Sequence, residues 1–328
     1  MTKVAYRQLG QSGLSVSAIG LGCMSLSGIY GAAEDAQSEA LIRHAIDIGI
    51  NHLDSSDMYG WGHNEEVIGR ALKGRRDKVV LATKFGQVRR DGGTNAVDGR
   101  AQYVVEACEA SLKRLGVEVI DLYYQHRVDP SIPVEETVGA MARLVEQGKV
   151  RFLGLSEARP DRIRRAHAVH PIAAVQTEYS ILYRDEAEET RETTRALGIG
   201  FVAYSPLGRG FLTGAIKDLS DVDGRRAQHP RFQAEHFQHN RELVRRIEAI
   251  ASQKGCSPSQ LTLAWLLGQG DDVVAIPGTR YPQRLDENIG AMGVQLTEAE
   301  LEQISAAVPK GSASGTRYPA GGMSGVYL

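Results

Sequence analysis

AQYVVEACEASLKRLGVEVIDLYY, residues 101–124, holds one copy of the unit that decides the fold. The apolar residues of Ala101–Leu115 recur at the spacing of an amphipathic helix. Gly116 follows at the position where a helix commonly ends in a left-handed residue. Val119–Tyr124 is a short apolar run, which is typical of a strand buried in a parallel sheet. The stretch therefore predicts one helix followed by one buried strand.

The same unit recurs along most of the chain, after a first apolar strand at residues 18–22. The expected helices are 37–48, 65–72, 101–115, 134–146, 162–169, 186–197 and 261–267, and the strands that follow them are 50–53, 78–83, 119–124, 150–155, 172–175, 200–203 and 273–276. Eight buried strands that alternate with helices favour a closed (β/α)8 TIM barrel, an α/β fold, over an open doubly wound sheet.

Five segments lie outside these helix–strand pairs. Residues 6–18 alternate around a Gly-bounded turn and predict an N-terminal β-hairpin. A helix at 283–291 follows the eighth strand, and the capping box Thr297–Glu300 opens an extra helix. Residues 207–240 and the tail 309–328, rich in Gly and polar residues, are expected to be loops. No domain boundary is visible, so residues 1–328 are expected to form a single barrel domain.

The bulk composition narrows the function. A net charge of -2 over 328 residues argues against a nucleic-acid partner held by a basic face. Three widely spaced cysteines form neither a disulfide framework nor a metal motif, so no metal is expected. No apolar leader or membrane-spanning run is present. These features predict a soluble, cytoplasmic protein without a membrane partner, and they leave its oligomeric state open.

Polar side chains follow the predicted strands at the barrel end where active sites of this fold lie. Asp54 ends the second strand, with Tyr59 in the loop beyond, while Lys84 and His126 end the third and fourth strands. Taken alone, Asp54 fits a turn cap and His126 a structural histidine. A lysine that finishes a buried strand needs a partner, and Asp54 on the neighbouring strand is the obvious one. The joint occurrence favours a site.

These four side chains suit one kind of chemistry. A nearby ammonium group stabilises a tyrosinate and lowers the pKa of the tyrosine, and a carboxylate holds the ammonium in place. Tyr59 could then donate a proton to a developing alkoxide, while His126 binds the same oxygen and orients the carbonyl. No nucleophile is required, so the missing partner is a hydride donor.

The eighth unit offers a place for that donor. Gly278–Arg280 leads into a helix that carries Arg284, and a Gly-rich loop at a helix N-terminus with added arginines suits phosphate groups. A second arginine favours NADPH over NADH, although solvated arginines on an ordinary helix would look the same. The chain has no Gly-x-Gly-x-x-Gly after a strand, so a Rossmann domain does not carry the cofactor.

Several motifs in order resemble the aldo-keto reductases over essentially the whole chain, and most closely the perakine-reductase-like and auxin-induced-protein-like branch. The matching stretches are residues 53–60, 82–84, 122–126, 148–156, 202–208, 276–280 and 284–288. The resemblance implies reduction of aldehydes or ketones with NADPH as the cofactor and a small-molecule carbonyl substrate. It also implies a catalytic tetrad of Asp54, Tyr59, Lys84 and His126, in which Tyr59 is the general acid.

The resemblance further implies how the cofactor is held. The nicotinamide would stack on Tyr204, and its amide would meet Ser156 and Gln176. The remaining expected contacts are Gly22, Cys23, Met24 and Asp54 near the ring, Ser205, Pro206, Leu207, Gly208 and Gly210 along the pyrophosphate, and Ile276, Gly278, Thr279, Arg280, Arg284, Glu287 and Asn288 around the adenosine. The chain departs from the family pattern at Glu157, where many members have Asn, and at Gly278, where many have Lys.

Two other classes of function remain open from the sequence. Potassium-channel β-subunits share the expected fold and the tetrad, so a nicotinamide-binding regulatory or sensor subunit is an alternative. A metal-dependent barrel hydrolase would use Asp54 and His126 but lacks a further ligand at metal spacing. The natural substrate would be set by Met24, Ile29, Tyr30 and Trp61, by the loop 207–240 and by the tail.

Overall fold

The computed structural model describes residues 3–28, 33–89 and 95–328. Its centre is an eight-stranded sheet in the order β3-β4-β5-β8-β9-β10-β11-β12, in which every neighbouring pair is parallel. The strands are β3 (Leu21–Gly22), β4 (His52–Asp54), β5 (Val80–Phe85), β8 (Ile120–Gln125), β9 (Val150–Ser156), β10 (Ile172–Glu178), β11 (Gly200–Tyr204) and β12 (Val273–Ala275).

The two edges of this sheet meet. Ile19 forms a parallel bridge with Ala275, the Gly20 N–H donates to the Ala275 carbonyl at 2.8 Å, and the Ala275 N–H donates to the Ala18 carbonyl at 2.9 Å. The predicted (β/α)8 barrel is therefore confirmed. The first strand is shorter than the predicted 18–22, because its early residues pair with β12 only through this bridge.

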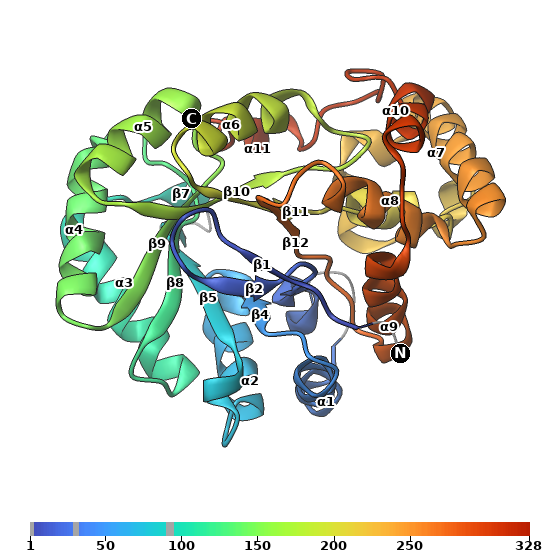
Figure 1. The fold of residues 1–328 in the computed structure, drawn as a ribbon. Helices are drawn as coiled ribbons and strands as arrows, with labels where there is room; N and C mark the ends of the chain where they lie inside the picture. Colours follow the sequence, from blue (N-terminus) through green and yellow to red (C-terminus); the bar gives the residue numbers. More distant parts are fainter. Residues whose placement is uncertain (1–2, 29–32, 90–94) are drawn as a thin grey trace.

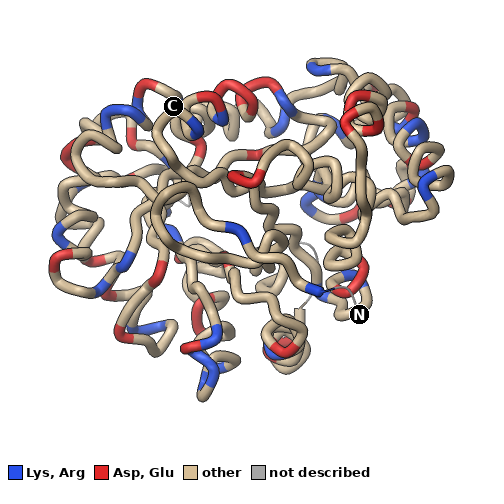
Figure 2. The backbone as a smooth tube through the Cα atoms, in the orientation of Figure 1, with Lys and Arg blue, Asp and Glu red and all other residues tan. Residues whose placement is uncertain are grey.

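Helices surround the barrel (Figure 1). They are α1 (Asp35–Asp47), α2 (His63–Ala71), α3 (Ala101–Leu115), α4 (Val134–Glu146), α5 (Pro160–Val169), α6 (Asp185–Ala196), α7 (Ala234–Lys254), α8 (Pro258–Leu267), α9 (Pro282–Gly290), α10 (Glu298–Ala307) and α11 (Ala320–Met323). Figure 2 shows acidic and basic residues interspersed along these outer helices. Within the described ranges, no helix is long and apolar enough to cross a membrane.

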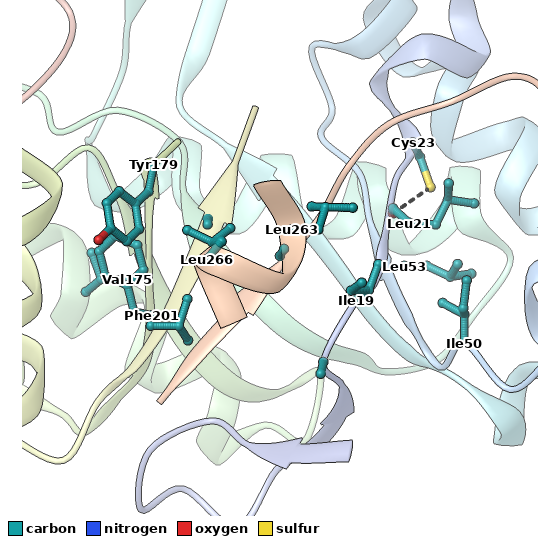
Figure 3. Packing of buried hydrophobic residues seen from close by; sticks show 14 of the residues in the cluster. Ile19, Leu21, Cys23, Ile50, Leu53, Val175, Tyr179, Phe201, Leu263 and Leu266 are labelled. Atoms are coloured by element: carbon teal, nitrogen blue, oxygen red, sulfur yellow. Dashed lines mark hydrogen bonds between the residues drawn. The ribbon is translucent and has the colours of Figure 1, made fainter. Parts of the chain in front are cut away.

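The apolar core has two layers. The outer layer lies between the strands and the helices, where the Tyr179 ring meets the rings of Phe201 and of Trp265 in α8, each at 5.7 Å; Figure 3 draws other residues of this layer. The inner layer fills the barrel and includes Leu122 and Val202. Burial of apolar area on both faces of the sheet explains why its strands read as continuous apolar runs.

The N-terminal hairpin closes one end of the barrel. Strands β1 (Tyr6–Gln8) and β2 (Ser15–Ser17) pair antiparallel, as predicted, and the Leu9 side chain joins the inner layer. The Gln11 N–H donates to the Gly198 carbonyl, which precedes β11. A Cβ atom on Gly200 would lie 2.7 Å from the Leu9 backbone, so glycine permits this close approach. The hairpin does not cover the opposite end of the barrel, where the strands finish and where the candidate active site lies.

Three elements were not predicted. Helix α7 begins at Ala234, inside the expected loop 207–240, and continues to Lys254. The rest of that loop contains short 3₁₀ turns at Gly208–Thr213, Leu219–Asp221, Gly224–Gln228 and Pro230–Phe232. A small hairpin, β6 (Gln87–Arg89) and β7 (Asn95–Val97), follows β5, and α11 lies within the tail.

The predicted α10 begins after Thr297, whose hydroxyl accepts from the Glu300 N–H.

Candidate active site

A buried ion pair joins the ends of strands β4 and β5. Lys84 Nζ lies 2.5 Å from Asp54 Oδ1 and donates to the Ser55 carbonyl at 2.7 Å. The Lys84 side chain is 0 % exposed and that of Asp54 is 3 % exposed. Burial lowers the pKa of Lys84, and the neighbouring Asp54 carboxylate opposes that shift. Asp54 Oδ2 also accepts from Gln176 Nε2 at 2.8 Å, so the carboxylate is held from two sides.

Tyr59 stands over this pair. It begins a 3₁₀ turn, Tyr59–Gly62, in which Gly60, Trp61 and Gly62 all have positive φ angles. Lys84 Nζ lies 5.2 Å from the centroid of the Tyr59 ring, within the range of a cation–π contact. The tight turn therefore brings Tyr59 back over β5.

His126 completes the group from the end of β8. Its ring meets that of Tyr59 edge-on, with the centroids 5.9 Å apart and the planes at 86°. Nδ1 lies 2.9 Å from Ser56 Oγ, which leaves Nε2 as the nitrogen available to a ligand. Burial, followed by the charges of Arg127 and Lys84, holds the pKa of His126 well below its usual range. The imidazole is thus neutral at physiological pH and can hydrogen-bond an oxygen.

A cavity of about 750 Å³ opens beside these residues. Tyr59, His126 and Asp54 line it, and Lys84 lies buried beneath it. Most of the residues expected to hold a cofactor line the same cavity: Gly22, Met24, Ser156, Gln176, Tyr204, Ser205, Pro206, Leu207, Gly210, Ile276, Gly278, Thr279, Arg280, Arg284, Glu287 and Asn288.

Two of the expected cofactor residues do not line the cavity. The Cys23 side chain is buried and its thiol donates to the Leu21 carbonyl at 3.5 Å, so it faces the protein interior. Gly208 is also buried, and a Cβ atom there would meet the Leu182 side chain at 3.3 Å. The residues directly before and after each of them line the cavity, but Cys23 and Gly208 themselves do not.

The charges on the cavity wall suit a ligand with several phosphate groups. Six arginines line it, namely Arg127, Arg209, Arg225, Arg226, Arg280 and Arg284, against three carboxylates, Asp54, Asp129 and Glu287. Backbone atoms also form part of the wall, because Gly22, Gly210 and Gly278 line the cavity and carry no side chain. Arginine pairs and exposed backbone are what phosphate groups require. The residues present therefore fit a nicotinamide dinucleotide.

The C-terminal tail forms part of the wall, as expected of a segment predicted to help set the substrate. Tyr318 and residues 321–322, 324–326 and 328 line the cavity. The Tyr204 hydroxyl donates to Glu157 Oε1 at 2.8 Å and lies 3.0 Å from the Tyr318 hydroxyl. The Glu157 carboxylate faces this tail and not the cavity. Glu157 stands where many members of the family have Asn, and its carboxylate accepts a hydrogen bond from Arg317 Nη1 at 2.8 Å.

The expected substrate determinants are only partly placed at the cavity. Met24 lines it, together with Met58 and Val97, which were not predicted. Trp61 is not among the lining residues and stacks instead against Arg89, at 4.5 Å. Ile29 and Tyr30 lie outside the described residues.

Arg127 also lines the cavity and was not among the residues predicted from the sequence. The only feature of the sequence that pointed to it was its position directly after His126.

Over residues 3–28, 33–89 and 95–328, no cluster of three or more His, Cys, Asp and Glu side chains is placed to hold a metal ion. The hydrolase alternative therefore gains no support from the structure.

Comparison with known proteins gives a consistent family. The profile of the Aldo/keto reductase family matches residues 18–309. The probable aldo-keto reductase 1 of Glycine max is 49 % identical over 315 residues, which cover 95 % of this chain and 91 % of that protein. Among solved structures, the glycerol dehydrogenase AKR11B4 from Gluconobacter oxydans is similar with a TM-score of 0.83 and 30 % identity, covering 94 % of this chain and 95 % of that one. The holo form of the aldo-keto reductase AKR11C1 from Bacillus halodurans gives a TM-score of 0.79 at 29 % identity and covers 93 % and 97 %.

Proposed function

Because this chain belongs to the aldo/keto reductase family, we propose that it reduces aldehydes or ketones to alcohols in the cytoplasm with NADPH. The observation that carries the proposal is the packing of Asp54, Lys84, Tyr59 and His126 at one wall of the cavity. A proton donor and a neutral imidazole there face the same space. No covalent intermediate with the protein is needed.

Each residue has a separate role. A nicotinamide held in this cavity would supply the hydride that the carbonyl carbon receives. Tyr59 donates its phenolic proton to the carbonyl oxygen, and the Lys84 ammonium stabilises the phenolate that remains. Asp54 holds Lys84 in place. His126 binds the same oxygen through Nε2 and orients the carbonyl. Ser156 and Gln176 are proposed to bind the nicotinamide amide, with the ring on Tyr204.

The preference for NADPH is proposed to come from the α9 end of the cavity. Thr279, Arg280 and Arg284 line that end, where Arg284 stacks over Tyr281 at 5.0 Å. Two guanidinium groups suit the extra 2′-phosphate better than a ribose hydroxyl. Many family members have a lysine at the position of Gly278, and Arg280 is proposed to supply the positive charge in its place.

Replacing Tyr59 with Phe tests the proposal. Turnover of 4-nitrobenzaldehyde should fall by at least about 10²-fold, the usual size of a general acid contribution. NADPH affinity, measured by quenching of protein fluorescence, should stay near that of the wild type. A variant that keeps more than about a tenth of the rate would show that Tyr59 is not the acid. A wild-type protein that binds NADPH but does not turn over repeatedly would favour the regulatory-subunit alternative.

A further inference from the structure

Arg127 presents an unused cationic edge to the cavity. It is partly buried and lines the cavity next to His126. Its Nη1 donates to the His126 carbonyl at 2.7 Å and lies 3.3 Å from Ser156 Oγ. In the part of the chain that the structure describes, its Nε and Nη2 have no hydrogen-bond partner, and no carboxylate lies within 4.0 Å of its guanidinium. These two nitrogens form the edge that binds a carboxylate through parallel hydrogen bonds.

The nearby carboxylates are already occupied. Glu157 is bound by both terminal nitrogens of Arg317, at 2.8 and 2.9 Å. Asp129 accepts from the Gly99 N–H at 2.9 Å and from the Ser131 hydroxyl at 2.6 Å. Glu157 acts on Arg127 only from a distance beyond direct contact, so an anion bound at the Nε and Nη2 edge would be stabilised by this partly buried cation.

The position of Arg127 points to the substrate and not to the phosphates of the cofactor. Arg127 is bonded to His126 and Ser156, at the tetrad end of the cavity. Burial lowers the pKa of Arg127, and Tyr204, Tyr318, Glu157 and Tyr59, which lie around the same end, together raise it above its ordinary value. Arg280 and Arg284 belong to the loop before α9 and to α9 itself. The two groups of arginines therefore serve different parts of a bound complex.

We propose that the preferred substrate is an oxo acid whose carboxylate pairs with the Nε and Nη2 edge of Arg127. Its carbonyl oxygen lies at the same time between Tyr59 and His126. This proposal rests on the proposed function and names the substrate class of the same site. The carbonyl carbon accepts the hydride, the oxygen takes the proton of Tyr59, and the carboxylate is unchanged. Met24, Met58 and Val97 on the wall suit an apolar body between the two polar groups.

A matched pair of aldehydes tests the inference. 4-Carboxybenzaldehyde and 4-nitrobenzaldehyde have nearly the same shape and differ in charge. Arg127→Met should lower kcat/KM for the carboxylate by about 10- to 100-fold, the range of one charged hydrogen-bonded pair. Loss of the Arg127 bonds to His126 and Ser156 affects both aldehydes alike, so the ratio of the two kcat/KM values, carboxylate over nitro compound, should fall by about 10-fold or more. Arg127→Lys should restore part of the discrimination. The exposed Arg143→Met controls for the loss of one positive charge.

A binding measurement separates this inference from the proposed function. Benzoate and benzamide cannot be reduced, so their affinity for the NADP⁺ complex can be measured by calorimetry without turnover. Benzoate should bind more tightly than benzamide to the wild type and no better than benzamide to Arg127→Met. Equal losses for charged and neutral ligands, or a loss of NADP⁺ affinity alone, would overturn the inference and leave carbonyl reduction standing. Absence of turnover with every aldehyde, with benzoate still preferred, would instead overturn the proposed function.

Discussion

Arg317, in the C-terminal tail, binds both carboxylate oxygens of Glu157, which follows β9, at 2.8 and 2.9 Å. The Arg317 side chain is 1 % exposed and that of Glu157 is 0 % exposed. Glu157 Oε1 also accepts from the Tyr204 hydroxyl at 2.8 Å. The tail is therefore tied through one carboxylate to the ring on which we propose that the nicotinamide stacks.

Replacing Arg317 with Ala should strongly destabilise the protein. It leaves the Glu157 charge buried without its partner, and removal of one member of a buried ion pair typically costs about 3–5 kcal/mol. Urea unfolding measures the loss. Glu157→Gln combined with Arg317→Met should recover part of it, because no charge then remains at position 157, while Glu186 still loses its 2.6 Å bond to Arg317. Equal instability of the single and double variants would contradict this account.

Replacing Lys84 with Met should abolish turnover and also destabilise the fold. Asp54 would keep its charge in a site where both side chains are almost fully buried, at a cost of several kcal/mol. Turnover should fall by about 10²-fold or more, since the phenolate of Tyr59 loses its ammonium. Adding Asp54→Asn should recover stability without recovering turnover. Stability is measured by urea unfolding and turnover by steady-state kinetics. If the double variant recovers turnover as well as stability, Lys84 does not take part in the reaction.

Replacing Asp57 with Asn should stabilise the protein in a pH-dependent way. Burial, followed by the charge of Glu65, raises the pKa of Asp57 to about 7 in the folded protein. The unfolded chain loses this proton near the ordinary value of 3.8, so between these pKa values it binds fewer protons than the folded protein. Stability therefore falls as pH rises from about 4 to 7, by at most ~1.4 kcal/mol per pH unit.

The advantage of Asp57→Asn over the wild type should accordingly grow from pH 5 to pH 7 and then stay level. Urea unfolding at four pH values between 5 and 8 measures it. The exposed Asp77→Asn removes the same charge and serves as the control. Parallel pH profiles for the wild type and Asp57→Asn would show that Asp57 is not the titrating group.

Replacing Arg284 with Ala should weaken NADPH binding much more than NADH binding. Loss of one charged hydrogen bond to a phosphate typically costs about 1.5–3 kcal/mol, which is roughly 10- to 100-fold in Kd. Fluorescence quenching with each cofactor measures the two affinities. An equal loss for both cofactors would mean that Arg284 does not contact the 2′-phosphate.

The barrel was predictable because its signals are local and repeated. Helices α3 and α4 begin and end where the apolar periodicity and the flanking residues placed them. Helix α7 was missed although Leu243, Val244 and Ile247 form a buried stripe, because its first two turns are polar and look like the loop before them. Apolar periodicity predicts a helix only where enough of its positions are apolar for the period to be visible.

The meeting of Asp54, Lys84 and His126 at one end of the barrel was predictable for a different reason. Parallel strands in a barrel finish at one end, so Asp54, Lys84 and His126 had to come near one another once the strands were assigned. The pair Glu157 and Arg317 spans 160 positions and follows no period, and the tail that carries Arg317 has no regular spacing. The use of Arg127 depends on which carboxylates are already occupied, and that is visible only in three dimensions.

The bridge between Ile19 and Ala275 also matters during synthesis. A ribosome that adds about 5–20 residues per second needs roughly 13–50 s to extend the chain over the 256 positions between them. Through that interval the nascent barrel keeps an unpaired edge at its first strand, and exposed strand edges invite pairing with other chains. Expression conditions that slow translation late in the message should therefore increase aggregation more than those that slow it early.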